Sequence, residues 1–137
     1  MSTGHYGLRL GVDHSIHRIR IAATDDTSAI LTREIGAPLL DHAMIPGRFV
    51  LSVGDDSLHT APINALATLI AQWLGLIDQR YHGTAMLTFY DDTRVTGIAE
   101  HQLAVIETIA RRFATDIGAP DYRPLRLALR TVILPGA

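Results

Sequence analysis

The feature that most constrains the fold is a change in the spacing of apolar residues about halfway along the chain. Near the start, Tyr6, Leu8 and Leu10 alternate with Gly7 and Arg9. A period of two is typical of half-buried strands. From residue 63 onward apolar residues recur at every third or fourth position, which is typical of one face of an amphipathic helix. The chain is therefore expected to combine strands and helices.

These patterns predict the element order β-β-β-β-α-β-α-β. The expected strands span residues 6–13, 18–23, 28–35, 48–53, 84–90 and 125–133, and the expected helices span residues 63–81 and 98–117. Residues 36–47 hold two prolines and are expected to form a loop, with room for a short helical turn at 39–42. Short turns between the early strands favour antiparallel pairing, and each helix has one apolar stripe to bury. The predicted fold class is an α/β (α+β) two-layer sandwich, a mainly antiparallel sheet of about six strands with two helices on one face.

The composition fits one globular domain spanning residues 1–137. Apolar residues make up 47% of the chain and charged residues 19%, and no internal repeat is visible. The formal net charge is −2, so no overall positive field would attract nucleic acid, and a nucleic-acid partner is not expected. Any site for an anionic ligand must come from a local arrangement of basic residues.

Two residue types are missing, and both absences exclude chemistry. Without cysteine there is no disulfide, thiolate nucleophile or cysteine-ligated metal. All 12 basic residues are arginine, so a Walker-type phosphate loop and Schiff-base catalysis are excluded, because both need a lysine amine. Codon bias is the simpler cause of the missing lysine, but the exclusions hold either way.

Nothing in the sequence predicts a membrane span or a secretory signal. The first six residues have no basic start followed by an apolar run. No stretch approaches the roughly 20 apolar residues that a spanning helix needs. A cytoplasmic location and no membrane partner are therefore expected.

One segment carries a family resemblance. Gly11-Val12-Asp13, a turn, and then residues 18–22 (Arg-Ile-Arg-Ile-Ala) resemble the first hairpin of the actin, heat-shock-chaperone ATPase and sugar-kinase superfamily. The element order is also similar to that of the ribonuclease H-like fold. The resemblance implies that Asp13 positions a metal ion, and that Asp91 or Asp92, after a later strand, supplies a second acidic group. The chain departs from these ATPases in its turn, which has no glycine after Asp13, and it has only one half of their fold.

The same acidic residues can be interpreted without the resemblance. Asp13, His14 and His17 together with Asp91 and Asp92 could hold magnesium, manganese or zinc. The metal could then activate water for phosphodiester hydrolysis. The alternative is that these aspartates build turns, since similar pairs recur at residues 25–26 and 55–56.

Arginines form the second candidate site. Five of them are expected opposite the main apolar side of their strands: Arg9, Arg18, Arg20, Arg126 and Arg130. If these strands are neighbours, one sheet face would present several guanidinium groups to phosphate, carboxylate or RNA backbone. The alternatives are a solvated outer face, or a rim that pairs with acidic residues of a second subunit.

No set of residues forms a coherent catalytic group, so no catalytic residue and no cofactor are assigned. The leading hypothesis is a non-enzymatic binding or assembly module with a protein partner or a second copy of itself, because an open sheet has edges that need protection. Its arginine-bearing face would receive an anionic ligand. The alternative is a metal-dependent phosphoryl- or phosphodiester-processing enzyme of ribonuclease H-like or actin-like ATPase fold, using Mg or Mn.

Overall fold

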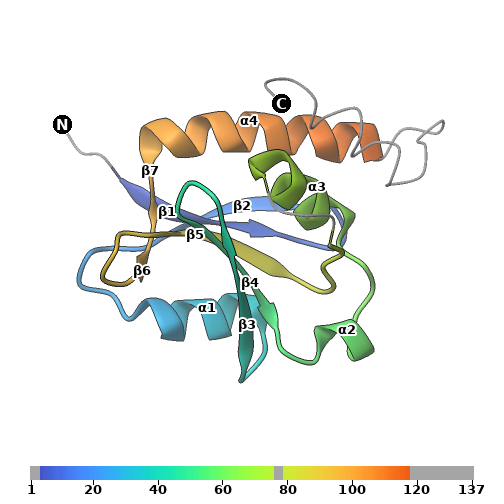
Figure 1. Ribbon diagram of the computed structural model, residues 1–137, viewed down its shortest axis with the longest axis horizontal. Helices are drawn as coiled ribbons and strands as arrows, with labels where there is room; N and C mark the ends of the chain where they lie inside the picture. The colour runs from blue at the N-terminus through green and yellow to red at the C-terminus, as the bar shows by residue number, and fades with distance from the viewer. Residues whose placement is uncertain (1–3, 76–78, 118–137) are drawn as a thin grey trace.

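An antiparallel sheet runs through the middle of the molecule, with helices above and below it (Figure 1). This computed structural model describes residues 4–75 and 79–117. The strands are β1 (His5–Leu10), β2 (Ile16–Arg20), β3 (Leu40–Ile45), β4 (Phe49–Gly54), β5 (Ala85–Tyr90), β6 (Val95–Thr96) and β7 (Ile98–Ala99). The main path through the sheet is β2-β1-β5-β4-β3, while β6 pairs with β5 and β7 with β1. The predicted sandwich with a mainly antiparallel sheet is confirmed.

Two helices cover one face of the sheet, as the apolar stripes predicted (Figure 1). They are α3 (Ala65–Leu74) and α4 (Glu100–Ile117). α3 begins where the side chain of Asn64 accepts a hydrogen bond from the Ala67 N–H, and it ends at Gly75, which has a left-handed backbone. Leu103 and Ile106 of α4 are buried against the same core as Leu8 and Leu87 of the sheet. This face holds the larger core.

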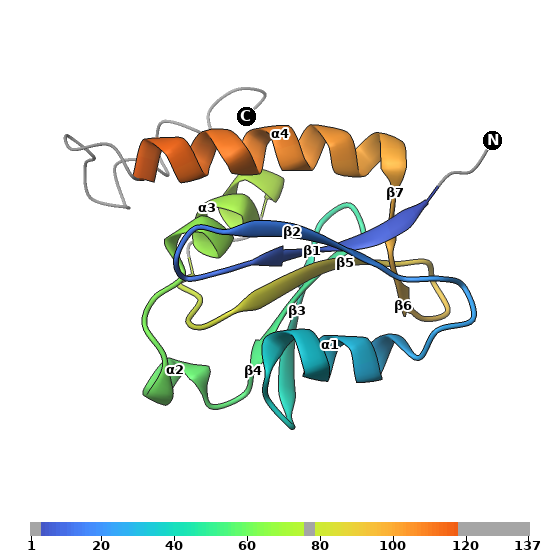
Figure 2. The same ribbon diagram turned by 180° about the vertical axis from the view of Figure 1, so that it is seen from behind.

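A third helix, α1 (Thr27–Ile35), lies against the opposite face of the sheet (Figures 1 and 2). The prediction of a strand at 28–35 is therefore wrong. Asp26 caps the first turn by accepting from the Ala29 N–H, and Gly36, at φ 79°, ends the helix in the left-handed region. Buried Ile30 and Leu31 give this helix its apolar side.

Beneath α1 lies a second apolar cluster. It includes Ile21 and Met86, both buried and outside the larger core. Gly7 makes room for them, because a Cβ at this position would lie 2.7 Å from the Met86 Cε and 3.2 Å from the Ile21 Cδ1. Helices therefore lie against both faces of the sheet, rather than against one face alone.

The loop predicted for residues 36–47 contains strand β3. Pro46 and Gly47 make the tight connection to β4, in which Gly47 and Arg48 both have positive φ and Ile45 pairs with Phe49. β3 has no clean apolar alternation because it lies at the end of the sheet, where neither face is fully covered.

Other boundaries also differ from the predictions. The first predicted helix (63–81) is shorter, since α3 ends at Leu74, and a separate short helix, α2 (Ser57–Thr60), precedes it. Residues 98–99 form β7 rather than the start of the last helix. The predicted strand at 125–133 lies outside the described residues. None of the helices in the described part of the chain has the length and apolar character to cross a membrane.

Candidate functional site

The outer edge of β3 is the first element of the site. β3 ends the strand path, and within residues 4–75 and 79–117 no strand pairs with its outer side. The Asp55 N–H donates to the Leu39 carbonyl at 3.0 Å, which fixes the phase of the β3–β4 ladder. Because backbone groups alternate in direction along an antiparallel strand, every second residue of β3 faces away from β4. The residues whose N–H and C=O point outward are Leu40, His42 and Met44.

This edge has few of the features that normally prevent strand addition, since its one charged residue is the exposed Asp41. β3 contains no lysine, arginine or proline, and it pairs with β4 along its whole length without a bulge. The opposite edge strand, β2, carries His17, Arg18 and Arg20. Charged residues, prolines and bulges are the usual means by which edge strands avoid pairing with another chain. Within the described residues, the β2 edge therefore carries more of this protection than the β3 edge, which has Asp41 alone.

Exposed apolar side chains surround the β3 edge. Leu39, directly before β3, is 64% exposed, Met44 is 56% exposed and Leu58 of α2 is 63% exposed. Met44 and Leu58 line the same hollow of about 470 Å³. Leu39 does not line this hollow, because side chains alternate along the strand and residues 39 and 44 point to opposite faces. Met44 and Leu58 are therefore the exposed apolar pair that the hollow brings together.

Polar groups line the hollow beside these apolar side chains. The His82 Nδ1 lies 3.1 Å from the Ala61 carbonyl, which can only accept, so this nitrogen carries the proton and Nε2 is the nitrogen left for another partner. His42 also borders the hollow, but its Nδ1 shares a hydrogen bond of 2.7 Å with the Oγ of buried Ser52, which is not among the lining residues. Burial raises the pKa of Tyr81, whose hydroxyl has no hydrogen-bond partner within the described chain. The hollow therefore combines hydrogen-bonding groups with an apolar rim.

The structure does not bring the predicted arginines onto one face. Arg9 Nη1 donates to Glu34 of α1 at 3.0 Å, whereas Arg18 lies on the opposite face, against α4. The reason is the hairpin register, which pairs Leu8 with Arg18 and so puts both on the side of the larger core. Arg20 shares that side and is exposed. Arg126 and Arg130 lie outside the described residues.

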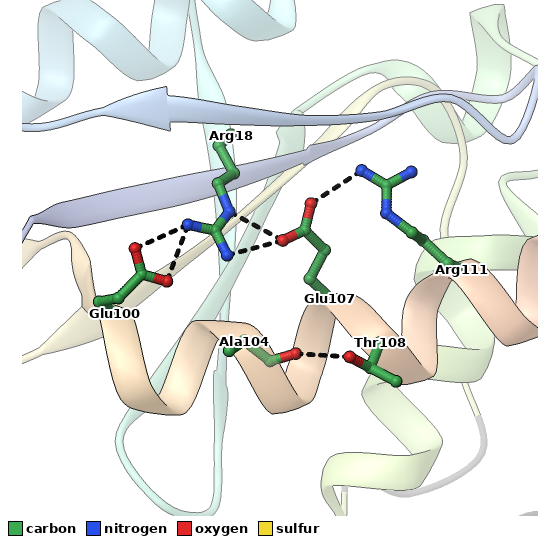
Figure 3. A network of polar contacts seen from close by, with 6 residues as sticks. All are labelled: Arg18, Glu100, Ala104, Glu107, Thr108 and Arg111. Carbon is green, nitrogen blue, oxygen red and sulfur yellow. Dashed lines mark hydrogen bonds and ion pairs between the residues drawn. The ribbon is translucent and has the colours of Figure 1, made fainter.

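Arg18 is held between two carboxylates of α4 (Figure 3). Its Nε donates to Glu107 and its Nη1 donates to Glu100, both at 2.8 Å, and its guanidinium lies 5.4 Å from the centre of the Tyr6 ring. Arg111 donates to the other oxygen of Glu107 at 2.8 Å. Burial opposes ionisation of Glu107, but hydrogen bonds from Arg111 and Arg18 outweigh it and lower the Glu107 pKa. The Arg18 guanidinium is therefore already matched by acidic partners.

The acidic residues expected to share a metal ion lie at opposite ends of the sheet. β1 and β5 are antiparallel, with Leu10 opposite Ala85. Asp13, after the end of β1, is therefore near the start of β5, whereas Asp91 and Asp92 follow the end of β5. They cannot bind one ion together, and the described residues contain no group of three or more His, Asp or Glu side chains placed to hold a metal.

Each of these carboxylates already has a partner in the chain, which for Asp13 and Asp91 lies in the same turn. Asp13 accepts from the Ser15 hydroxyl at 2.6 Å and from its N–H at 3.1 Å. Asp91 accepts from the hydroxyl and the N–H of Thr93 at 2.7 and 3.0 Å. These hydrogen bonds lower the pKa of both aspartates, with the serine or threonine hydroxyl as the largest favourable cause. Asp92 forms an ion pair of 2.8 Å with Arg48.

The β3 edge is the surface that the sequence interpretation missed. Pro46-Gly47 was a usable signal, because a Pro-Gly pair between two apolar segments marks a turn that can join two strands. The exposure of Leu39 and Met44 could not be inferred, since it depends on β3 ending the sheet.

Comparison of the chain with family models, with curated proteins and with solved structures finds no match. The resemblance to the ribonuclease H-like and actin-like folds therefore stays a prediction, and a functional proposal has to rest on the geometry of the chain itself.

Proposed function

We propose that this protein is a binding and assembly module that pairs an extended polypeptide strand with the outer edge of β3. The observation that carries the proposal is the set of outward backbone groups of Leu40, His42 and Met44, in a strand that has no lysine, arginine or proline. Main-chain hydrogen bonds supply affinity when a strand adds to a sheet edge, and neighbouring side-chain pockets supply specificity. The hollow lined by Met44 and Leu58 lies beside this edge, where it can bind side chains of the added strand and so supply specificity.

The anionic ligand predicted from the arginines has weaker support. Arg9 and Arg18 lie on opposite faces, and each has a glutamate partner at hydrogen-bond distance. A ligand anion would have to displace these carboxylates, so the arginines supply local ion pairs rather than a common surface.

The test removes one outward N–H from the edge. In His42→Pro the missing N–H and the added ring block strand addition, while the ladder with β4 is kept because the His42 N–H faces away from it. His42→Ala is the matched control, since it removes the imidazole but keeps the N–H. The probe is a set of short peptides with alternating apolar residues, and the readout is the amide NMR shifts of β3.

We expect peptides to shift the amides of Leu40 and Met44 in the wild type and in His42→Ala, and to leave those of a folded His42→Pro unchanged. Binding that survives His42→Pro would contradict the proposal. So would the absence of any shift at β3, with peptides or with rising protein concentration, up to millimolar levels.

A further inference from the structure

The partner of this edge follows from the sequence of β3 itself, on the basis of the proposed function. We infer that the added strand is β3 of a second copy of the chain, so that two sheets join across a two-fold axis at His42. Each copy then contributes the same strand, and the two open edges cover one another.

The outward residues of β3 are complementary to themselves about His42. In an antiparallel pair related by a two-fold axis perpendicular to the sheet, one residue faces its own copy. With His42 at the axis, Leu40 of each copy faces Met44 of the other, and the three outward residues all exchange backbone hydrogen bonds. Leu40 and Met44 are apolar, and Met44 is 56% exposed in the single chain. The pairing therefore buries apolar surface on both sides of the axis.

Pairing two copies about any other residue of β3 from Leu40 to Met44 is less favourable. An axis at Asp41 sets two aspartates directly opposite one another, which is destabilising. An axis at Leu40 or Met44 sets His42 opposite Pro38 or Pro46, and proline has no N–H to donate. An axis at Ala43 sets Leu40 opposite Pro46 and leaves a shorter ladder. Only an axis at His42 pairs all outward residues without a charge conflict or a proline.

The two edges of the sheet differ in a way that favours a closed dimer. The β2 edge carries His17, Arg18 and Arg20, and Arg18 is tied to α4. Two copies meeting at β2 would bring like charges together, whereas two copies meeting at β3 about His42 would place each Asp41 opposite Ala43. Pairing of one edge with its own copy closes after two subunits, whereas pairing of β3 with β2 would continue into a filament.

The first experiment measures the oligomeric state of the full chain by analytical ultracentrifugation over a range of concentrations. We expect the wild type to dimerise, and Met44→Lys to weaken the dimer at least tenfold because the charge would be buried beside the apolar pair. Val105→Lys is the matched control, since Val105 lies on α4 and is 57% exposed, nearly the same as Met44. It should leave the dimerisation constant unchanged.

The second experiment tests the register with single cysteine substitutions. The chain has no cysteine of its own, so no other thiol can form a cross-link. In His42→Cys the two thiols face each other across the axis, with Cα atoms about 5.5 Å apart, within reach of a disulfide. In Leu40→Cys the two thiols lie about 14 Å apart, four residues along the strand. A glutathione redox buffer should therefore cross-link His42→Cys and leave Leu40→Cys uncross-linked.

The outcomes separate this inference from the proposed function. If the wild type stays monomeric while peptides still shift the β3 amides, the inferred dimer is wrong and the proposed strand-binding function is kept. Hydrogen exchange gives a further outcome. If the amides of Leu40, His42 and Met44 are protected equally at every protein concentration, a segment of the same chain covers the edge, and the inferred dimer is wrong. A dimer that persists in Met44→Lys, or that cross-links through Leu40→Cys, overturns the pairing described here.

Discussion

Asn64 joins three parts of the molecule through one buried side chain. Its amide nitrogen donates to the Leu10 carbonyl at 2.9 Å and to the Gly83 carbonyl at 2.8 Å. Its amide oxygen accepts from the Ala67 N–H at 3.0 Å and so caps α3. The residue is fully buried. Only a side chain with both donors and an acceptor can make all three bonds, which asparagine has and aspartate lacks when ionised.

We therefore expect Asn64→Asp to lower the free energy of unfolding by about 3 kcal/mol or more, although aspartate is as good a helix cap as asparagine. The carboxylate keeps the bond from Ala67, but it removes the hydrogen bonds to the Leu10 and Gly83 carbonyls and buries a charge. Urea denaturation measures the change. Asp26→Asn at the exposed cap of α1 is the control, and it should stay within about 0.5 kcal/mol. Equal effects at the two caps would show that the Asn64 amide bonds contribute nothing.

At the scale of elements, the Arg18 ion pairs fasten β2 to α4. Within the part of the chain that the structure describes, β2 pairs with β1 alone, so it depends on α4 for further contacts. We expect Glu107→Gln to lower the free energy of unfolding near pH 7 by about 1 kcal/mol, since solvent screens part of each ion pair. Asp116→Asn, an exposed carboxylate later on the same helix, is the control and should have little effect.

The effect of Glu107→Gln should also depend on pH. The Glu107 pKa is lowered in the folded protein from its ordinary value of 4.5. A carboxyl group with a lowered native pKa contributes its full stability above its unfolded value and loses it as pH falls through the native value. Thermal unfolding should therefore show a constant gap between wild type and variant above about pH 5.5, which closes toward pH 3. A gap of the same size at both ends of this range would contradict the role given to the charge.

The elements themselves were predictable to different degrees. α4 was clear from its sequence because an apolar residue recurs on one face from Leu103 to Phe113. α1 was mistaken for a strand because a segment of nine residues is too short to show a clear helical repeat, and its helix is set by the Asp26 cap and by Gly36. These caps fit a turn equally well, since aspartate and glycine are common in both. The short segment alone could not decide between the two.

At the scale of the whole molecule, the sequence could not say which side of each strand meets which helix. Leu8 and Ile19 each alternate with arginine, and it was natural to place both on one apolar face. The hairpin pairs Leu8 with Arg18 and Gly7 with Ile19, so the apolar sides of β1 and β2 point to opposite faces. That register depends on how residues 11–15 turn, and a shift by one residue reverses every side chain. The predicted arginine surface failed for this reason, because it required one shared face.

Because helices cover both faces of the sheet, residues buried on either face should contribute to the stability of the whole fold. Leu31 of α1 is 2% exposed, packed on the face that the sequence interpretation left open to solvent. We expect Leu31→Ala to lower the free energy of unfolding by about 2–5 kcal/mol, as a buried leucine does in a packed core. Leu103→Ala, on the α4 face and fully buried, should fall in the same range. Val105→Ala, at a position 57% exposed, should change it by about 0.5 kcal/mol or less. Urea denaturation measures these changes. If Leu31→Ala lowers the free energy of unfolding by as little as Val105→Ala does, then α1 does not cover the sheet, and the second apolar cluster around Met86 is not part of the core.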